Sequence, residues 1–205
     1  LIDDILGIVA LTLITSLAVF WLLFTVRTGE DGFTLYRLTG NLRVFFRLDG
    51  LGKVFAGLIA FLWPFATLYA FEYMRHGERE NTFFAYYTMT YGVTAGIAFA
   101  GNMVTLYLFY ELLTLATFPL VLHTRTPEAV RAARKYLYYS IGGAAFAFIG
   151  LVFVITYGSS ADFVYGGVLH EHIAGGSRDM LLLMYVLAYF GFGVKAALFP
   201  CHGWL

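Results

Sequence analysis

Residues 102–122 read NMVTLYLFYELLTLATFPLVL, an uncharged stretch except for one residue near its middle, Glu111. A helix needs about 20 apolar residues to cross the hydrocarbon core of a bilayer. Glu111 would then lie about 15 Å from either end of the helix, at 1.5 Å of rise per residue. The stretch therefore predicts a transmembrane helix with one carboxyl group at mid-membrane.

Similar uncharged intervals recur along the whole 205-residue chain. Hydrophobic residues make up 60% of the sequence and charged residues 13%, which is about half the charge of a typical soluble domain. This composition excludes a soluble globular domain and a disordered chain. It predicts an all-α integral membrane protein, a polytopic helix bundle with six spans at 5–26, 53–71, 82–100, 102–122, 136–157 and 180–205.

Charge and motif content narrow the function classes. The net charge of zero provides no field that would favour nucleic acid as a partner. The single cysteine, Cys201, cannot form an intrachain disulfide. The chain has no Walker loop, dinucleotide-binding glycine pattern or nucleophile triad, and no span carries the histidines of a transmembrane haem. We therefore expect no metal or cofactor in this chain, and a transport role rather than a catalytic one.

Several connections carry local structural signals. The dipeptide Gly101-Asn102 predicts a turn between two spans. Thr126 before Pro127 is typical of a helix start, with a cap residue and a proline at the first helical position. The connection 27–53 contains FTLYRL, TGN and LRVFFRLD, which predict a β-hairpin. This hairpin should lie outside the hydrocarbon, where its open edges can be solvated.

The distribution of basic residues indicates an orientation. Counting every loop gives a tie between the two sides, but a hairpin that folds on its own is a weak topology signal. Without the hairpin, one side has only Arg178 and the other has six residues: Arg75, Arg79, Arg125, Arg131, Arg134 and Lys135. The positive-inside rule then predicts that the loops 72–80 and 123–135 face the cytoplasm.

The chain ends do not resemble those of a complete protein. The first residue is Leu1 rather than methionine, and the last residue falls within an apolar stretch. We therefore expect the chain to be a fragment of a larger membrane protein.

A second ionisable residue, Lys195, lies inside the span 180–205. The surrounding sequence GFGVKAALFPCHGWL includes Gly193 and Pro200, and a proline there would remove the backbone hydrogen bond to Ala196. One interpretation is a discontinuous helix of the kind that lines ion sites in transporters. The alternative is an ordinary proline kink.

The two buried charges also allow two interpretations. An ionised group near mid-membrane costs roughly 2.5–3.5 kcal/mol, so Glu111 and Lys195 should face the bundle interior or a hydrated path. Burial disfavours the charged form of each group, whereas a nearby opposite charge favours it, so moving one partner would change the proton affinity of both. This chemistry suits proton transfer. The alternative is a structural ion pair that supports assembly.

Other candidate residues have simpler explanations. Lys135 begins the fifth span, where physics alone favours a side chain that extends to the headgroups. His202 carries an imidazole, a group that usually titrates near neutral pH and therefore suits proton exchange, although a lone histidine is more often structural. Tyr136 is typical of an interfacial anchor. The small residues of Gly92-xxx-Gly96 and of 142–145 predict close helix contacts.

The segments GNMVTLYLFYELLTLATFPLVLH, EAVRAARKYLYYSIGGAAFAF and GFGVKAALFPCHGWL resemble the antiporter-like membrane subunits shared by respiratory complex I (NADH:quinone oxidoreductase), membrane-bound hydrogenases and Mrp-type cation/proton antiporters. The resemblance extends from about residue 45 to 205. It implies a roughly fourteen-helix inverted-repeat transporter, of which this chain would contain the second to seventh core helices. Its most specific elements are the mid-helix Glu111 and Lys195.

The resemblance also implies residue roles. Glu111 would be the acid of the fifth core helix, Lys195 the lysine of the discontinuous seventh helix, and Lys135 the lysine at the start of the sixth. His202 would match a histidine that is frequent after the break, with Gly193 and Pro200 as helix-breaking residues. Proton translocation would use these groups, while redox cofactors would belong to other subunits.

The implied organisation has three parts: a first transmembrane helix with an outer-face hairpin at 1–52, two helices before the transporter core at 53–100, and the N-terminal part of the antiporter-like domain at 101–205. The expected partners are other membrane subunits of a multisubunit complex, protons, the lipid bilayer and, in an Mrp-type antiporter, sodium. The implied location is a bacterial or archaeal cytoplasmic membrane. A non-transporting scaffold subunit is the remaining alternative.

Overall fold

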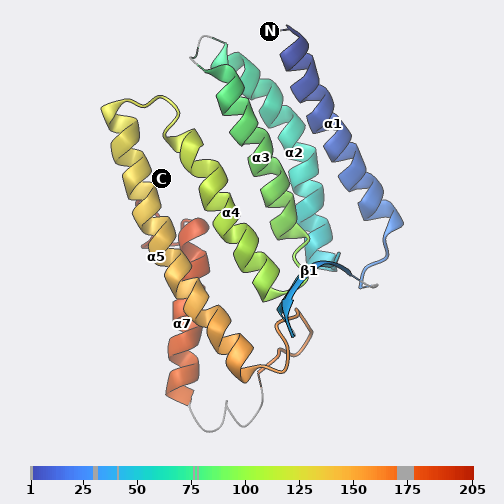
Figure 1. Ribbon diagram of the computed structural model, residues 1–205, viewed down its shortest axis with the longest axis vertical. Helices are drawn as coiled ribbons and strands as arrows, with labels where there is room; N and C mark the ends of the chain where they lie inside the picture. Colours follow the sequence, from blue (N-terminus) through green and yellow to red (C-terminus); the bar gives the residue numbers. More distant parts are fainter. Residues whose placement is uncertain (1, 30–31, 41, 76, 78, 170–177) are drawn as a thin grey trace.

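The computed structural model describes residues 2–29, 32–40, 42–75, 77, 79–169 and 178–205. In these residues, six long helices lie alongside one another, and a two-stranded antiparallel sheet lies at one end of the bundle (Figure 1). The elements are α1 (Ile2–Thr25), β1 (Phe33–Thr39), β2 (Leu42–Phe46), α2 (Gly50–Met74), α3 (Glu80–Ala98), α4 (Met103–Val121), α5 (Pro127–Tyr157) and α7 (Arg178–Lys195).

The helices pack mainly on their sequence neighbours: α1 on α2, α2 on α3, α3 on α4, α4 on α5, and α7 on α5. Large apolar side chains remain exposed along the bundle, for example Leu17 at 67% and Phe65 at 59%. Soluble monomers seldom expose so much contiguous apolar surface, whereas lipid-facing helices do. The predicted all-α membrane bundle is therefore confirmed.

Four of the described helices, α1, α2, α4 and α5, are long and apolar enough to cross a membrane by themselves. The helices α3 and α7 contain 19 and 18 residues, which is also close to span length. Their composition is more polar, because α3 is rich in threonine and tyrosine and α7 includes Arg178, Asp179 and Lys195. Composition alone thus supports four of the six predicted spans.

Small residues bring α5 and α7 into close contact. A Cβ atom added to Gly191 of α7 would stand 2.4 Å from the backbone nitrogen of Ala147, and one added to Gly150 of α5 would stand 2.6 Å from the Cβ of Ala188. The close contact predicted for 142–145 is confirmed at Gly143, which faces Val194. By contrast, nothing lies within 4 Å of an added Cβ on Gly142.

The predicted contact of Gly92-xxx-Gly96 is only half right. A Cβ atom on Gly96 would stand 2.2 Å from the ring of Phe109 on α4, so this glycine does permit close packing. A Cβ on Gly92 would meet nothing within 4 Å, and Gly92 is exposed. The two glycines are four residues apart, but only one of them lies under the neighbouring helix.

Two predicted spans have different boundaries as helices. Helix α5 begins at Pro127, well before residue 136, and the Thr126 side chain caps it by accepting a hydrogen bond from Ala129 N at 3.2 Å. The predicted helix start at Pro127 is confirmed. The predicted span 136–157 was short because an uncharged interval marks the part of a helix suited to lipid, not the whole helix. The span 180–205 is helical only as far as Lys195.

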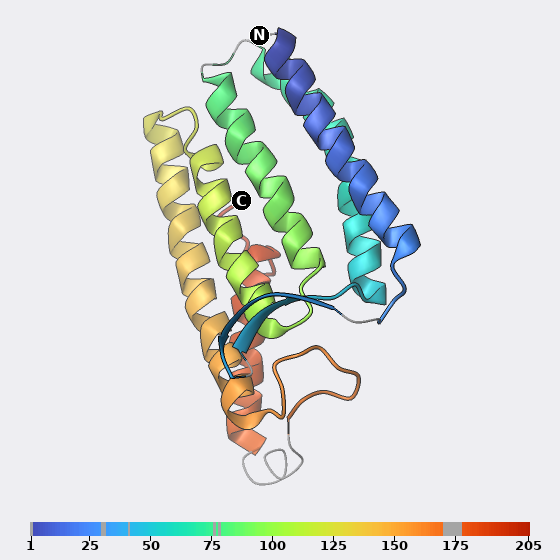
Figure 2. The same ribbon diagram turned by 45° about the vertical axis from the view of Figure 1, so that its right-hand side comes forward.

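The predicted hairpin is confirmed as β1 and β2, although Asn41 of its expected turn lies outside the described residues. The hairpin lies at the end of the bundle opposite the α2–α3 and α4–α5 connections (Figure 2). Arg43 of β2 forms an ion pair with Asp162 at 2.7 Å, and Gly101 N donates a hydrogen bond to Phe45 O at 2.9 Å. The hairpin is thus attached to segments that precede α4 and follow α5.

Asn102 organises this attachment. Its side chain is fully buried, and its Oδ1 accepts a hydrogen bond from Thr105 N at 2.8 Å, which caps α4. Its Nδ2 donates to Arg43 O at 2.9 Å, and the Thr105 hydroxyl accepts from Phe45 N at 2.8 Å. The predicted turn at Gly101-Asn102 is confirmed, and the same asparagine also holds the hairpin against the start of α4.

Candidate functional site

Helix α7 ends at Lys195 through a backbone motif that needs no proline. Ala197 has φ of 53°, in the left-handed region, so that Ala197 N donates to Val194 O at 3.1 Å and Leu198 N donates to Gly193 O at 2.9 Å. These paired bonds are a Schellman motif, which satisfies carbonyl groups at a helix C-terminus. The missing side chain of Gly193 leaves room for Leu198, which would stand 3.0 Å from an added Cβ.

The helix ends before Pro200 rather than at it. A proline-freed carbonyl at Ala196 would require the helix to continue to Pro200, but the described chain has turns from residue 196 onward. Trp204 folds back, and its Nε1 donates to Val194 O at 2.9 Å. The last turn of α7 is therefore stabilised by the chain that follows it.

The ammonium group of Lys195 lies in an aromatic and hydroxyl-lined environment. Its Nζ donates a hydrogen bond to the hydroxyl of Tyr136 on α5 at 2.8 Å. It also lies 5.0 Å from the ring centroid of Tyr136 and 5.6 Å from that of Tyr110 on α4. Cations within about 6 Å of a ring face are attracted by its quadrupole. Lys195 is thus held between α4 and α5.

The hydrogen bonds around Tyr136 have one consistent direction. The Tyr136 hydroxyl lies 2.5 Å from the Thr117 hydroxyl on α4, and Thr117 donates to Leu113 O at 2.6 Å. Each hydroxyl has one proton to donate. Because Thr117 uses its proton on the carbonyl, Tyr136 donates to Thr117 and accepts from Lys195. This chain orients the ammonium group and ends on backbone.

Tyr136 is a site residue that the sequence interpretation assigned wrongly. It is only 4% exposed, so it is not an interfacial anchor. The ring of Trp204 packs edge-on against it, with centroids 5.3 Å apart. The sequence offered one signal for this role: Tyr136 is an aromatic residue with a hydroxyl group and directly follows Lys135. Its hydrogen-bond partner, Lys195, lies 59 residues away in the sequence, so the signal did not identify the contact.

Glu111 and Lys195 do not form a direct ion pair in the described structure, where the ion pairs join other residues. Lys195 nevertheless approaches the residue before Glu111, because its Nζ lies 5.6 Å from the ring centroid of Tyr110. The Glu111 Oε1 atom is buried and has no hydrogen-bond partner among the described residues, and the same is true of the Thr114 hydroxyl one turn later. A buried polar atom without a hydrogen-bond partner is energetically costly. The Glu111 Oε1 atom therefore calls for a hydrogen bond or a proton that the described residues do not supply.

Tyr110, the residue before Glu111, connects α4 to α7. Its hydroxyl donates to Gly191 O at 2.8 Å, and its ring packs edge-on against Phe192 with centroids 5.5 Å apart. This bond lies one helical turn before Lys195. The bond fixes the position of α4 along the axis of α7. It therefore also fixes the position of Glu111 relative to Lys195 along that axis.

The remaining predicted residues lie around the end of α7 but outside the hydrogen-bond chain. Lys135 is exposed, and its Nζ would stand 4.0 Å from a Cβ added to Gly203, which also approaches the Tyr139 hydroxyl. His202 is exposed, and its ring stacks on that of Phe199 with centroids 5.7 Å apart. Lys195 thus lies near Tyr110, the residue before Glu111, Lys135 borders the segment after α7, and His202 is exposed.

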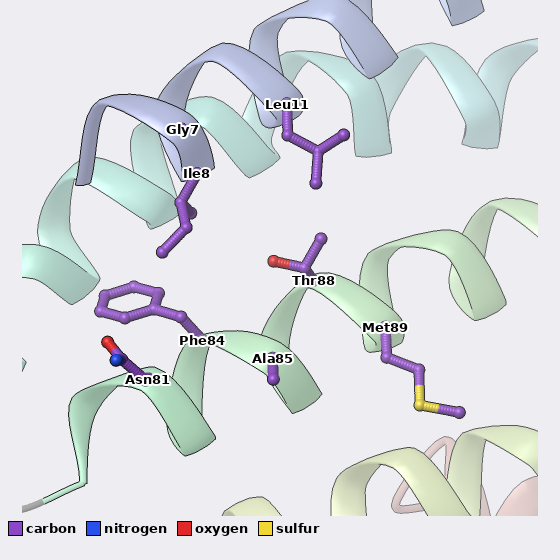
Figure 3. Close-up of a pocket in the computed structure, with 8 residues that line it drawn as sticks. All are labelled: Gly7, Ile8, Leu11, Asn81, Phe84, Ala85, Thr88 and Met89. Atoms are coloured by element: carbon purple, nitrogen blue, oxygen red, sulfur yellow. The ribbon is translucent and has the colours of Figure 1, made fainter. Parts of the chain in front are cut away.

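A separate cavity of about 600 Å³ lies between α1 and α3, and Figure 3 shows the side chains around it. It is mostly apolar and is lined by Gly7, Ile8, Leu11, Asn81, Phe84, Ala85, Thr88 and Met89. None of these is a predicted site residue. In the described part of the chain, no three His, Cys, Asp or Glu side chains gather where they could hold a metal ion.

Residues 100–205 match the sequence profile of the family described as NADH:quinone oxidoreductase/Mrp antiporter, transmembrane. A Na(+)/H(+) antiporter subunit from Alkalihalophilus pseudofirmus is 30% identical over 167 residues, which are 80% of this chain and 20% of that protein. Subunit N of the NADH-quinone oxidoreductase from Desulforudis audaxviator is 29% identical over 160 residues, which are 77% of this chain and 31% of that protein. The chain thus spans between a fifth and a third of the length of these relatives.

The fold is also that of solved membrane complexes. A chain of the membrane-bound sulfane sulfur reductase, an archaeal respiratory membrane complex, superposes with a TM-score of 0.73 at 20% identity, over 96% of this chain and 40% of that one. A chain of the Mrp complex from a Dietzia species superposes with a TM-score of 0.71 at 16% identity, over 100% of this chain and 37% of that one. The helix bundle is therefore a multi-pass membrane fold.

Proposed function

Because this chain belongs to the NADH:quinone oxidoreductase/Mrp antiporter transmembrane family, we propose that it is part of a proton-translocating, antiporter-like subunit of a multisubunit membrane complex. Glu111 and Lys195 would carry the exchangeable protons. Redox chemistry with NADH, quinone or hydrogen would take place on partner subunits. The proposal rests on the chemistry of this site as well as on family membership.

The observation that carries the proposal is the placement of Lys195 at the last residue of a helix that stops inside the bundle. Its ammonium group is held by one hydrogen bond to Tyr136 and lies 5.6 Å from the ring centroid of Tyr110, the residue before Glu111, without an ion pair to the Glu111 carboxyl among the described contacts. A pair that is close but not in contact can be brought together or separated by a small helix movement. Such a movement changes the proton affinity of both groups.

The residues divide into proton carriers and positioning residues. Lys195 and Glu111 can each gain or lose a proton, whereas Tyr136, Thr117 and Tyr110 orient them. The hydroxyl chain through Tyr136 ends on Leu113 O, so it holds the lysine rather than conducting protons onward. Moving one charge across the membrane requires about 2.3 kcal/mol per 100 mV, which the partner reaction must supply.

Lys135 and His202 would exchange protons at the ends of a proton path that runs through Glu111 and Lys195. Lys135 borders Gly203, just beyond the end of α7, and its exposure lets it exchange protons with solvent or with a neighbouring subunit. The exposed ring of His202 would serve in the same way. In this scheme Gly193 and the turns that include Pro200 separate the two halves of a discontinuous helix.

A sodium/proton antiporter is the second candidate function. It is favoured by the relative named as part of a Na(+)/H(+) antiporter, whereas the relative named NADH-quinone oxidoreductase subunit N favours a redox-driven pump. Both candidates use the same two partly buried residues, Glu111 and Lys195. Transport assays of the full-length protein in vesicles at varied sodium concentration distinguish them, because only the antiporter dissipates a proton gradient in response to sodium.

The division of the chain at about residue 101 is also part of the proposal. The family profile begins at residue 100, next to the capping residue Asn102 of α4. The segments 1–52 and 53–100 would then support the transporter core, and 101–205 would contain its proton-carrying residues.

The central experiment removes each charge in the full-length protein. We expect Glu111→Gln and Lys195→Met each to abolish proton transport in vesicles while leaving complex assembly intact. Glu128→Gln is the matched control, because Glu128 is exposed and pairs with Arg131 at 2.7 Å on the surface of α5. Normal pumping in both buried-site variants would refute the proposal. Lost assembly with residual transport would instead favour a scaffold role for the two charges.

A further inference from the structure

A cavity of about 760 Å³ lies at the end of the bundle where α2 joins α3 and α4 joins α5. Figure 1 shows both connections at the same end, away from the hairpin. The cavity is lined by two arginines and a histidine, Arg79, His123 and Arg125, and by the side chains of Tyr73, Phe83 and Leu120. Among these described lining residues, the connections supply the two arginines and the helices supply mainly apolar and aromatic side chains.

Both arginines have an unusual backbone conformation. Arg79 has φ of 60° and Arg125 has φ of 54°, so both are in the left-handed region. This conformation costs an L-residue with a Cβ roughly 1–2 kcal/mol, and glycine would adopt it freely. Backbone strain of this kind is often retained where a side chain has a function. Here both strained residues line the same cavity.

Among the described residues that line the cavity, the charged side chains are those of Arg79 and Arg125. Arg75 pairs with Glu72 at 3.5 Å and Arg131 pairs with Glu128 at 2.7 Å, but neither basic residue lines the cavity. Arg79 and Arg125 are both exposed, so each guanidinium is accessible to a ligand. Glu80, the next residue after Arg79, begins α3 and is not among the lining residues.

The position of the cavity selects the kind of anion. The helices α2 and α4, which are long and apolar enough to cross a membrane, end at Met74 and Val121. We therefore expect the cavity, which includes Met74 and the residues just after Val121, to lie near the boundary between hydrocarbon and headgroups. Phe83 and His123, which both line the cavity, are in edge contact with each other, with ring centroids 5.4 Å apart. An anion bound here would have apolar side chains beside it on the membrane side. Basic pockets between transmembrane helices are a recurrent way to hold anionic lipid headgroups.

We propose that this cavity binds an anionic phospholipid, with its phosphate between Arg79 and Arg125 and its acyl chains leaving past Phe83 and Leu120. The site is separate from Glu111 and Lys195, and the proposal does not depend on proton transport. Free inorganic phosphate shares the headgroup chemistry but has no acyl chains to bury. The two ligands can therefore be distinguished experimentally.

The test uses the full-length protein, freed of lipid in a neutral detergent and titrated with phosphatidylglycerol while native mass spectrometry counts the bound lipid. The variants are Arg79→Gly and Arg125→Gly, because glycine fits the positive φ at both positions and should preserve the fold. We expect the apparent affinity for phosphatidylglycerol to fall about fivefold for each arginine removed, as for one charge at an anionic headgroup. Arg131→Gln, which lies outside the cavity, should leave the affinity unchanged.

Three further results decide the proposal. Arg79→Lys and Arg125→Lys should retain most of the affinity, and phosphatidylcholine should bind equally to all variants. Inorganic phosphate at millimolar concentration should not displace phosphatidylglycerol. Equal affinity of the double glycine variant and the unmodified protein for phosphatidylglycerol would overturn the proposal. Displacement of the lipid by inorganic phosphate would also overturn it, since the site would then be a general anion site.

Discussion

The α1–α3 region and the α4–α5–α7 region both bury polar side chains, but they do so with different chemistry. In α1–α3 the buried contacts are neutral: the Ser16 and Tyr91 hydroxyls are 2.7 Å apart, and Trp63 stacks on Tyr91 with ring centroids 4.8 Å apart. In α4–α5–α7 the hydroxyls of Tyr136 and Thr117 instead hold the ammonium group of Lys195.

The difference shows what helix packing requires and what it does not. Three helices of this bundle are joined by hydroxyl, aromatic and small-residue contacts, and their buried described residues include no Asp, Glu, Lys or Arg. Buried ion pairs are weak sources of stability in any case. The charged groups of the second region therefore need an explanation other than packing, and proton transport supplies one.

The largest effect is expected from closing the contact between α5 and α7. In Gly191→Ala the new Cβ would stand 2.4 Å from Ala147 N and 2.8 Å from Gly143 O, both of which are backbone atoms. We expect destabilisation of about 3 kcal/mol or more, measured as a lower thermal unfolding midpoint of the full-length protein. Gly142→Ala is the control, because its Cβ would meet nothing within 4 Å. Equal midpoints for the two variants would contradict the packing described above.

The next effect compares one tyrosine from each region. Tyr136→Phe removes the hydroxyl that accepts from Lys195, and a hydrogen bond to a charged group contributes about 1.5–3 kcal/mol. We expect proton transport to slow by a factor of roughly ten or more and the pH profile of transport to be displaced. Assembly of the complex should be unchanged. Tyr91→Phe removes a buried hydroxyl from the neutral region. If Tyr91→Phe displaced the pH profile as much as Tyr136→Phe, Tyr136 would have no special positioning role.

A smaller effect is expected for the hydroxyl pair of the first region. Ser16→Ala leaves the Tyr91 hydroxyl without its 2.7 Å partner. The cost should be about 1 kcal/mol of stability, visible as a modest decrease in the thermal unfolding midpoint. Proton transport per assembled complex should stay at the unmodified rate. A transport defect without loss of stability would mean that the neutral region also takes part in proton movement.

The smallest effect is expected at the end of α7. Ala197 has φ of 53°, so Ala197→Gly should relieve backbone strain and stabilise the Schellman motif by up to about 1 kcal/mol. Ala132→Gly is the opposite control, because Ala132 is exposed within α5 and glycine in a helix interior costs about 1 kcal/mol. The two unfolding midpoints should move in opposite directions, and a decrease for both would argue against left-handed strain at Ala197.

Local features of the chain were predictable because their signals lie within a few residues. The start of α5 at Pro127 follows from a capping threonine and a proline, and both hairpin strands follow from alternating side chains. The break near Lys195 was predicted from glycine and proline content, but its mechanism was assigned to Pro200. In the structure α7 ends at Lys195 in a Schellman motif with a left-handed φ at Ala197, an alanine position that no composition rule marks as left-handed.

The sequence by itself determined the membrane bundle, the hairpin and the presence of two charges where lipid-facing helices cannot tolerate them, since hydropathy and charge act residue by residue. Only the tertiary structure decided what those charges contact. Lys195 meets Tyr136 from 59 residues away, and Tyr110 reaches Gly191 from 81 residues away. Such contacts depend on the rotation and height of one helix against another, and small residues such as Gly191 set both by allowing the backbones to approach.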